Sequence, residues 1–220
     1  MPQKPTLTLR YIRVSITNMK YVESSSETRP YRKAARAEAE RATGEAILDA
    51  ALNAFGRELF DHVTLQQIAE DSGVTVQTVI RRFGSKEELF EALVERERPR
   101  ILASREAAEA DGLEAAVGAL LEHYEADGDT ILNFIAQERR VALVRQIVEE
   151  GRRIHREWVE RHCAALLDGL DGAARQEVLF AAMAGTDLYT WKLLRRDRGL
   201  EASRVHRVMM RILNGLRRWG

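Results

Sequence analysis

The sequence predicts an all-helical protein, with a small three-helix N-terminal domain followed by a larger helical domain. From residue 31 the chain is rich in Ala, Glu and Arg, which are strong helix formers. Only four prolines interrupt its 220 residues. Apolar residues also recur at helical spacing along most of the chain. We therefore expect an all-α fold with a flexible tail at residues 1–30, a first domain at 31–90 and a second at 91–220.

Composition limits where the protein can work and what it can bind. The single cysteine, Cys163, excludes an intramolecular disulfide and fits a reducing compartment. No run of about 18 apolar residues exists, and the N-terminus has no signal-type segment, so we expect a cytoplasmic protein without membrane contact. Basic side chains outnumber acidic ones in residues 1–42, and the reverse holds for 43–90. Contact with nucleic acid would therefore have to come from a small, directed patch. Met1 and Met19 both remain possible start residues.

Three polar residues predict three closely spaced helix starts after a first helix at about 43–56, which could extend back towards Arg32. Thr64, Thr75 and Ser85 each precede an apolar-periodic segment and can cap the amide three residues on. Gly73 permits a sharp turn between the first two segments. The expected helices are 64–71, 76–83 and 86–101.

The segment 76–83 has one apolar and one cationic side. At about 100° per residue, one stripe holds Val76, Val79, Ile80 and Phe83, which we expect to be buried. The opposite side holds Gln77, Thr78, Arg81 and Arg82, and residues 75–86 contain no acidic residue. Amide and guanidinium groups can bond bidentately to adenine and guanine. The pattern therefore favours DNA reading in the major groove over a merely solvated helix face.

Residues 43–90 resemble the DNA-binding domain of the TetR family of transcriptional regulators. The matching positions are Ile47, Ala50-Ala51, Phe55, Thr64, Ile68-Ala69, Gly73-Val74-Thr75, Thr78, Phe83 and Lys86-Glu87. The resemblance implies a helix-turn-helix domain with a recognition helix at 76–83, a homodimer, and a C-terminal domain that binds a small-molecule effector. Gln77, Ile80 and Leu59 depart from the usual family residues, which are Gly, an aromatic phosphate contact and Gly.

The resulting hypothesis is a sequence-specific regulator of transcription, a repressor that binds a palindromic operator as a dimer and is released by a ligand. The residues expected to contact DNA are Thr64, Thr75, Val76, Gln77, Thr78, Arg81, Arg82 and Lys86. Gln77 and Arg81 would read bases, whereas Thr75, Thr78, Arg82 and Lys86 would meet phosphates. The basic segment 29–41 could also follow the DNA backbone. Two alternatives remain: a helical binding module or carrier that uses the helix-turn-helix for protein contacts, and an all-helical enzyme.

Beyond residue 101 we expect helices at 113–124, 130–139, 142–168, 173–195 and 202–218. The segments ADG at 110–112, ADGD at 126–129, GLDG at 169–172 and RDRG at 196–199 are the predicted breaks. The last two helices resemble the pair through which family members dimerise. The expected dimer residues are Leu179, Met183, Leu188, Trp191, Val205, Met209, Ile212 and Leu216, although such stripes can equally cover the chain's own core.

An effector pocket could be lined by aromatic, histidine and methionine side chains, but core packing explains the same pattern. The candidates are Tyr124, Phe134, His155, Trp158, His162 and Met183. His155, His162 and Cys163 lack a fourth ligand, so we expect no metal and no cofactor. Nucleophile elbows, phosphate-cradling loops and HExxH motifs are missing, so an enzyme is not expected.

Overall fold

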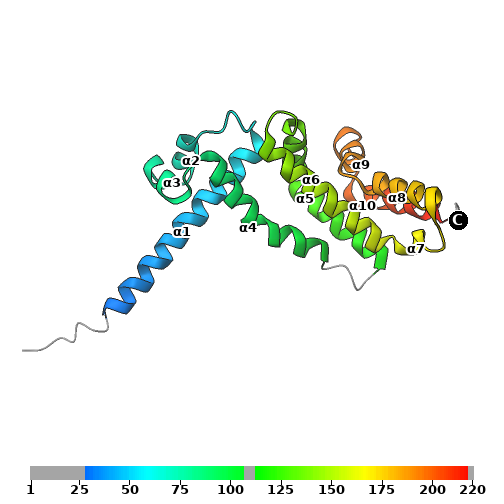
Figure 1. Ribbon diagram of the computed structural model, residues 1–220, viewed down its shortest axis with the longest axis horizontal. Helices are drawn as coiled ribbons and strands as arrows, with labels where there is room; N and C mark the ends of the chain where they lie inside the picture. Colours follow the sequence, from blue (N-terminus) through cyan, green and yellow to red (C-terminus); the bar gives the residue numbers. More distant parts are fainter. Residues whose placement is uncertain (1–27, 107–111, 218–220) are drawn as a thin grey trace, which may run out of the picture. The chain divides into compact units, whose positions relative to one another are not determined.

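The computed structural model describes residues 28–106 and 112–217, in which every regular element is a helix (Figure 1). The expected all-α class is therefore confirmed. Contacts divide the chain between Arg41 and Ala42, so the two sides of this boundary are described separately. Most of the expected tail and most of the ADG break lie outside the described residues.

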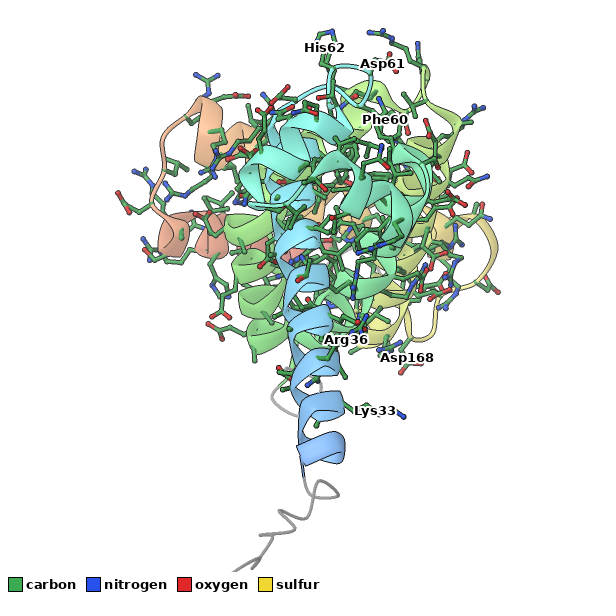
Figure 2. The ribbon with its side chains drawn as sticks, turned by 90° about the vertical axis from the view of Figure 1, so that its left-hand side faces the viewer. Lys33, Arg36, Phe60, Asp61, His62 and Asp168 are labelled. Carbon is green, nitrogen blue, oxygen red and sulfur yellow. The ribbon has the colours of Figure 1, made fainter. Side chains whose placement is uncertain are left out.

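Helix α1 (Thr28–Arg57) begins well before the core helix expected at about 43–56. Residues 33–42 are exposed along their whole length, and Figure 2 labels Lys33 and Arg36 on this stretch. Ion pairs within the helix join Arg36 to Glu40 at 3.1 Å and Arg41 to Glu38. These pairs neutralise part of the basic character that the sequence shows here.

The three predicted caps are all present and start α2 (Leu65–Asp71), α3 (Val76–Phe83) and α4 (Lys86–Glu106). The hydroxyls of Thr64 and Thr75 accept hydrogen bonds from the amides three residues on, at 3.2 and 3.3 Å. Ser85 and Glu88 bond reciprocally, amide to side chain, at 2.7 and 3.1 Å. Gly73 adopts a φ of 70°, which allows the tight turn between α2 and α3.

The N-terminal core is a cluster of buried side chains centred on packed phenylalanine rings. Phe55, Phe60 and Phe90 pack with ring centroids 4.8–5.3 Å apart, and Phe134 of α5 lies 5.5 Å from Phe90. The later helices also contribute to this core, which is made of Ile47, Leu48, Ala50, Ala51, Ala54, Phe55, Phe60, Val63, Ile68, Ala69, Val79, Leu89, Phe90, Leu93, Val144 and Val148.

Helix α5 (Gly112–Gln137) is continuous, so the expected pair of helices at 113–124 and 130–139, separated by ADGD, is wrong. Gly128 lies inside this helix, where an indole ring occupies the space that a larger residue would need. A Cβ atom at this position would lie 2.5 Å from Cη2 of Trp191. Nearby carboxylates, Glu125 and Asp129, pair with arginines of a later segment, which stabilises the polar middle of α5.

The remaining helices are more broken than the sequence predicts. The expected helix 142–168 is divided into α6 (Ala142–His162) and α7 (Ala164–Leu167). The expected helix 173–195 becomes α8 (Gly172–Thr186), α9 (Leu188–Trp191) and the π-helix η1 (Lys192–Asp197). The Asp187 side chain caps the new start at Leu188 by accepting a hydrogen bond from the Tyr189 amide. Helix α10 (Ala202–Leu216) matches its predicted range. Figure 1 shows α5 and α6 side by side.

The C-terminal core lies between α5, α6, α7, α8, α9 and α10. Its members are Ala116, Val117, Leu120, Leu121, Tyr124, Trp158, Val159, Cys163, Leu166, Leu167, Val178, Leu179, Ala182, Leu188, Trp191, Val205, Met209 and Leu213. Helix α5 therefore contributes to both cores, with Tyr124 in the C-terminal core and Phe134 packed against the N-terminal one.

Candidate DNA-binding surface

Helix α3 presents long polar side chains to solvent on a buried support. Gln77, Arg81 and Arg82 are exposed, whereas Val79 is fully buried in the N-terminal core. Gln77 and Arg81 stand four residues apart, so their side chains lie next to each other on one side of the helix. Neither side chain is engaged by another described residue. This pair therefore remains available for another molecule.

The prediction that Ile80 lies on the buried stripe of the helix is wrong. Its side chain is 43% exposed, whereas its neighbour Val79 is completely buried. The buried side of α3 is narrower than the helix wheel predicts, since Val76 and Phe83 are only half-buried. The exposed side of α3 thus includes one large apolar residue among its polar ones.

The threonines expected at phosphates have local roles in the fold. The Thr75 hydroxyl lies 3.0 Å from that of Thr78 and also caps α3. Thr64 caps α2 and is exposed. A hydroxyl has one donor and two acceptor lone pairs, so each can cap a helix and still meet a phosphate. The predicted contacts are therefore compatible with this geometry.

The two neighbouring arginines of α3 occupy different environments. The guanidinium of Arg82 lies against α1, where a Cβ atom at Gly44 would be only 2.6 Å from its Cζ atom. It also lies 5.9 Å from the ring centroid of Phe83. Arg81 has no such support and projects freely. The structure thus separates the pair into a supported cation and a free one, while their predicted DNA contacts stay predictions.

Lys86 points back towards the turn that joins α1 to α2. Its ammonium donates hydrogen bonds to the carbonyl oxygens of Phe60 and Val63 at 2.8 and 3.1 Å. It also lies 4.7 Å from the centroid of the Phe60 ring. The structure therefore gives Lys86 a role in holding this turn, which Figure 2 marks at Phe60, Asp61 and His62. Its predicted phosphate contact stays a prediction.

Two amide side chains of α5 hold the same turn from the other side, and sequence reasoning missed them. The buried Gln137 accepts a hydrogen bond from the Phe60 amide at 2.6 Å. Asn133 donates to the carbonyl oxygens of Phe55 and Glu58 at 3.1 and 2.9 Å. These partners lie 75–78 residues apart in the chain, so no local signal marks them. Together they attach the end of α1 to α5.

Helix α4 carries alternate arginines that reach three different helices. Arg96 pairs with Asp49 of α1 at 2.7 Å, and Arg98 pairs with Glu150 of α6 at 2.8 Å. Arg100 pairs with Asp127 of α5 at 2.9 Å. Charged neighbours raise the pKa of Arg98 and Arg100, through hydrogen bonds to Glu95 and Asp127 first of all. These pairs join α4 to the helices around it.

The residues expected to line an effector pocket do not all come together. Tyr124, His155 and Trp158 are buried and His162 and Met183 half-buried, but Phe134 packs in the N-terminal core instead. The Tyr124 hydroxyl donates to the Thr186 carbonyl at 3.1 Å, and His155 Nε2 lies 3.4 Å from the Thr186 hydroxyl. A surface hollow of about 500 Å³ lies elsewhere, at the corner of α6, α7 and α8.

The C-terminal half contains buried polar atoms for which the described residues supply no hydrogen-bond partner. They are Nε1 of Trp158 and Nε2 of His123, which has a side-chain exposure of 1%. The Nδ1 atom of His123 lies 3.0 Å from Asp127 but is poorly aligned for a hydrogen bond. Burial raises the pKa of Asp127, but His123 and Arg100 outweigh this and lower it overall. Unpartnered buried groups of this kind are rare in proteins.

Most of the residues expected at a dimer interface are buried within the chain itself. Leu179, Leu188, Trp191, Val205 and Met209 are at most 6% exposed, and Met183 and Leu216 are half-buried. Ile212 is the exception at 38%. The large apolar side chains left exposed on the C-terminal helices are Phe180, Tyr189, Leu193 and Ile212.

Cys163 and the histidines near it do not form a metal site. Among the residues that the structure describes, no group of three or more potential ligands could hold a metal ion. Burial raises the pKa of the Cys163 thiol to about 11, which keeps it protonated at neutral pH. The thiol is therefore a small apolar member of the C-terminal core.

Helices α2 and α3 form a helix-turn-helix whose second helix presents the exposed side chains of Gln77 and Arg81. Residues 47–93 match the sequence profile of bacterial regulatory proteins of the tetR family. Residues 47–93 are thus similar to the N-terminal domain of tetR-family regulators, as the sequence resemblance indicated.

Solved structures of transcriptional regulators have the same fold. A TetR-like regulator from Rhodococcus sp. RHA1 is 17% identical, with 78% of this chain and 93% of that chain covered and a TM-score of 0.61. A tetR-family regulator from Streptomyces coelicolor is 17% identical, with 80% and 86% covered and a TM-score of 0.61. The fatty acid degradation regulator FadR from Bacillus halodurans is 16% identical, with 77% and 94% covered and a TM-score of 0.55. At these identities the likeness concerns the fold.

No protein with a curated description matches the sequence. Among the described residues, no helix combines the length and the apolar character needed to cross a membrane.

Proposed function

We propose that the protein represses transcription by binding a palindromic operator as a homodimer through α3, and that a small ligand releases it. The observation that carries the proposal is the free pair Gln77 and Arg81 on a helix whose opposite side is fixed in the core. Residues 75–86 contain no acidic side chain, so this part of the surface attracts phosphates rather than repelling them. The match of residues 47–93 to the tetR-family domain also supports DNA binding.

Operator selection from a random DNA pool, followed by gel-shift titration, tests this function. The selected sites should contain two inverted half-sites whose centres lie about one helical turn apart, since a twofold dimer presents two copies of α3. Arg81→Ala should weaken binding to the selected site by roughly 10- to 100-fold and relax one base preference. Arg198→Ala, which removes an exposed arginine from the turn before α10, is the matched control and should leave binding unchanged. Equal losses on operator and scrambled DNA for Arg81→Ala would remove the base-reading role.

The dimer is proposed to form through α8 and α10. Phe180 of α8 is 53% exposed and Ile212 of α10 is 38% exposed. These helices already pack closely, since a Cβ atom at Gly185 would lie 2.8 Å from Cγ2 of Ile212. A second copy would remove both apolar side chains from water. Phe180→Glu and Ile212→Glu should therefore give monomers in sedimentation experiments, whereas Leu193→Glu, at an equally exposed apolar position, should remain dimeric.

Ligand release is proposed to involve the C-terminal helices, where His123 and Trp158 leave buried polar atoms unpartnered. A ligand that binds one domain arrangement better than the other shifts the population towards it. A thermal-shift screen with apolar compounds that carry a hydroxyl or carboxyl group would identify candidates. A compound that stabilises the protein must also lower its operator affinity in the gel-shift assay. Compounds that stabilise the protein without affecting operator binding would contradict ligand release.

A further inference from the structure

Ile80 is the exposed apolar residue that the proposed DNA contacts do not yet explain. Among the described residues of α1 to α4, no other large apolar side chain is as exposed as its 43%. The four comparable residues all belong to the α8 to α10 segment. Ile80 instead lies on the short helix that carries the free Gln77 and Arg81. On a helix that enters the major groove, an exposed apolar side chain can pack against an apolar group of the DNA.

Helix geometry places Ile80 beside the two proposed base readers. Ile80 is three residues after Gln77 and one before Arg81, so its direction differs from theirs by about 60° and 100° around the axis. All three side chains are exposed, while Val79 points into the core. Ile80 also lies about 4.5 Å further along the axis than Gln77, close to the 3.4 Å rise of one base-pair step.

The major groove offers one apolar group on its base edges, the 5-methyl group of thymine. A hydrocarbon side chain cannot bond a phosphate or a base edge, but it can pack against this methyl group and exclude water from both. Gln77 next to it favours adenine, and the thymine of an A·T pair lies in the same groove. We propose that Ile80 is a specificity-determining residue that contacts the methyl group of a thymine within one or two steps of the base pair read by Gln77.

This inference rests on the proposed operator binding and adds one base preference per half-site. Steric contact with the sugar–phosphate backbone would not distinguish thymine from other bases. A thymine preference that depends on the methyl group and on Ile80 is therefore specific to the inferred contact.

Deoxyuridine substitution tests the contact because it removes the thymine methyl group and leaves the base-pairing edge unchanged. Each thymine of the selected operator is replaced in turn, and affinity is measured by gel shift. For the unmodified protein, one position per half-site should lose about fourfold in affinity, the value expected for removing one buried methyl group. Ile80→Ala should bind the thymine operator more weakly and should be indifferent to deoxyuridine at that position.

Controls separate this inference from general effects. Leu193→Ala truncates an apolar side chain of similar exposure outside α3 and should keep the full deoxyuridine sensitivity. Replacing the thymine by cytosine should weaken binding, and 5-methylcytosine should recover part of the loss for the unmodified protein and none for Ile80→Ala. Thermal unfolding of Ile80→Ala checks that the fold persists.

These experiments distinguish failure of the proposed function from failure of the Ile80 inference. A protein that selects no DNA sequence at all overturns the proposed function and this inference with it. A protein that selects an operator but tolerates deoxyuridine at every position overturns the inference alone. If Ile80→Ala keeps the sensitivity, the methyl group is read by another residue, and the assignment to Ile80 is wrong.

Discussion

The two cores of the molecule differ in whether their buried polar groups have hydrogen-bond partners. Around the N-terminal core, Gln137, Asn133 and Lys86 all reach backbone atoms of the turn between α1 and α2. In the C-terminal half, His123 Nε2 and Trp158 Nε1 are buried without a hydrogen-bond partner. A buried unpaired group costs about 1–3 kcal/mol of stability. The chain itself thus satisfies the buried polar groups around the N-terminal core, whereas these two atoms of the C-terminal half have no partner among the described residues.

Gln137→Leu should produce the largest effect, because it removes a polar group that the N-terminal core uses. The Phe60 amide would lose its acceptor in a buried place, at a cost of about 2–3 kcal/mol in the free energy of unfolding. Urea denaturation followed by circular dichroism measures the change. Gln146→Leu, on the exposed side of α6, is the matched control and should stay within about 0.5 kcal/mol. Equal effects of the two substitutions would contradict the role of Gln137.

Gly128→Ala should destabilise the C-terminal half, although alanine is the better helix former. The added Cβ atom would lie 2.5 Å from the Trp191 ring, and overpacking of this kind costs about 1–3 kcal/mol. Gly118→Ala provides the comparison, since nothing lies within 4 Å of a Cβ atom there. That substitution should be neutral or stabilising in the same urea experiment. Stabilisation by both would show that Trp191 can move away.

Asp127→Asn should change how stability depends on pH. The pKa of Asp127 is lowered in the folded protein, so its carboxylate adds stability above its ordinary pKa of 3.8, and this is lost as the pH falls further. The unmodified protein should therefore be more stable than Asp127→Asn at pH 7, with the gap closing as the pH falls below about 4. Urea midpoints at several pH values measure the gap. A gap that stays constant with pH would contradict the ionised contact.

Trp158→Phe should have the smallest effect and sharpens the contrast with Gln137→Leu. It removes the unpartnered indole N–H from the C-terminal core while keeping an aromatic ring. The smaller ring loses packing contacts, which destabilises the protein, but it also removes a buried N–H without a partner, which stabilises it. The free energy of unfolding should therefore change by no more than about 1 kcal/mol. A loss as large as that of Gln137→Leu would show that the indole N–H has a stabilising partner, and the difference between the two cores would disappear.

Local chemistry made much of the N-terminal half predictable. The caps at Thr64, Thr75 and Ser85 act within three residues, so the sequence alone located the starts of α2, α3 and α4. The free Gln77 and Arg81 followed from the same wheel that wrongly buried Ile80. That error arose because burial depends on the width of the core beneath α3, which a single helix cannot reveal.

Contacts between distant residues explain what the sequence could not predict. The close packing at Gly128 depends on Trp191, far along the chain, and the attachment of α1 depends on Gln137, 77 residues from Phe60. His123 was not a candidate because its burial comes from the packing of several helices. Conversely, the apolar stripe through Trp191, Val205 and Met209 was correctly recognised as a stripe, but its residues face the chain's own core.

The composition of the N-terminal core limits where the chain can be cut into parts that fold independently. Val144 and Val148 of α6 belong to this core, and Phe134 of α5 packs against it. A fragment that ended near residue 90 would leave the rings of Phe55 and Phe90 exposed to water on that side. Any transplant of α1 to α4 onto another protein would therefore have to include the tip of the α5–α6 hairpin as well. We expect chimaeras joined after this hairpin to fold and those joined before it to aggregate.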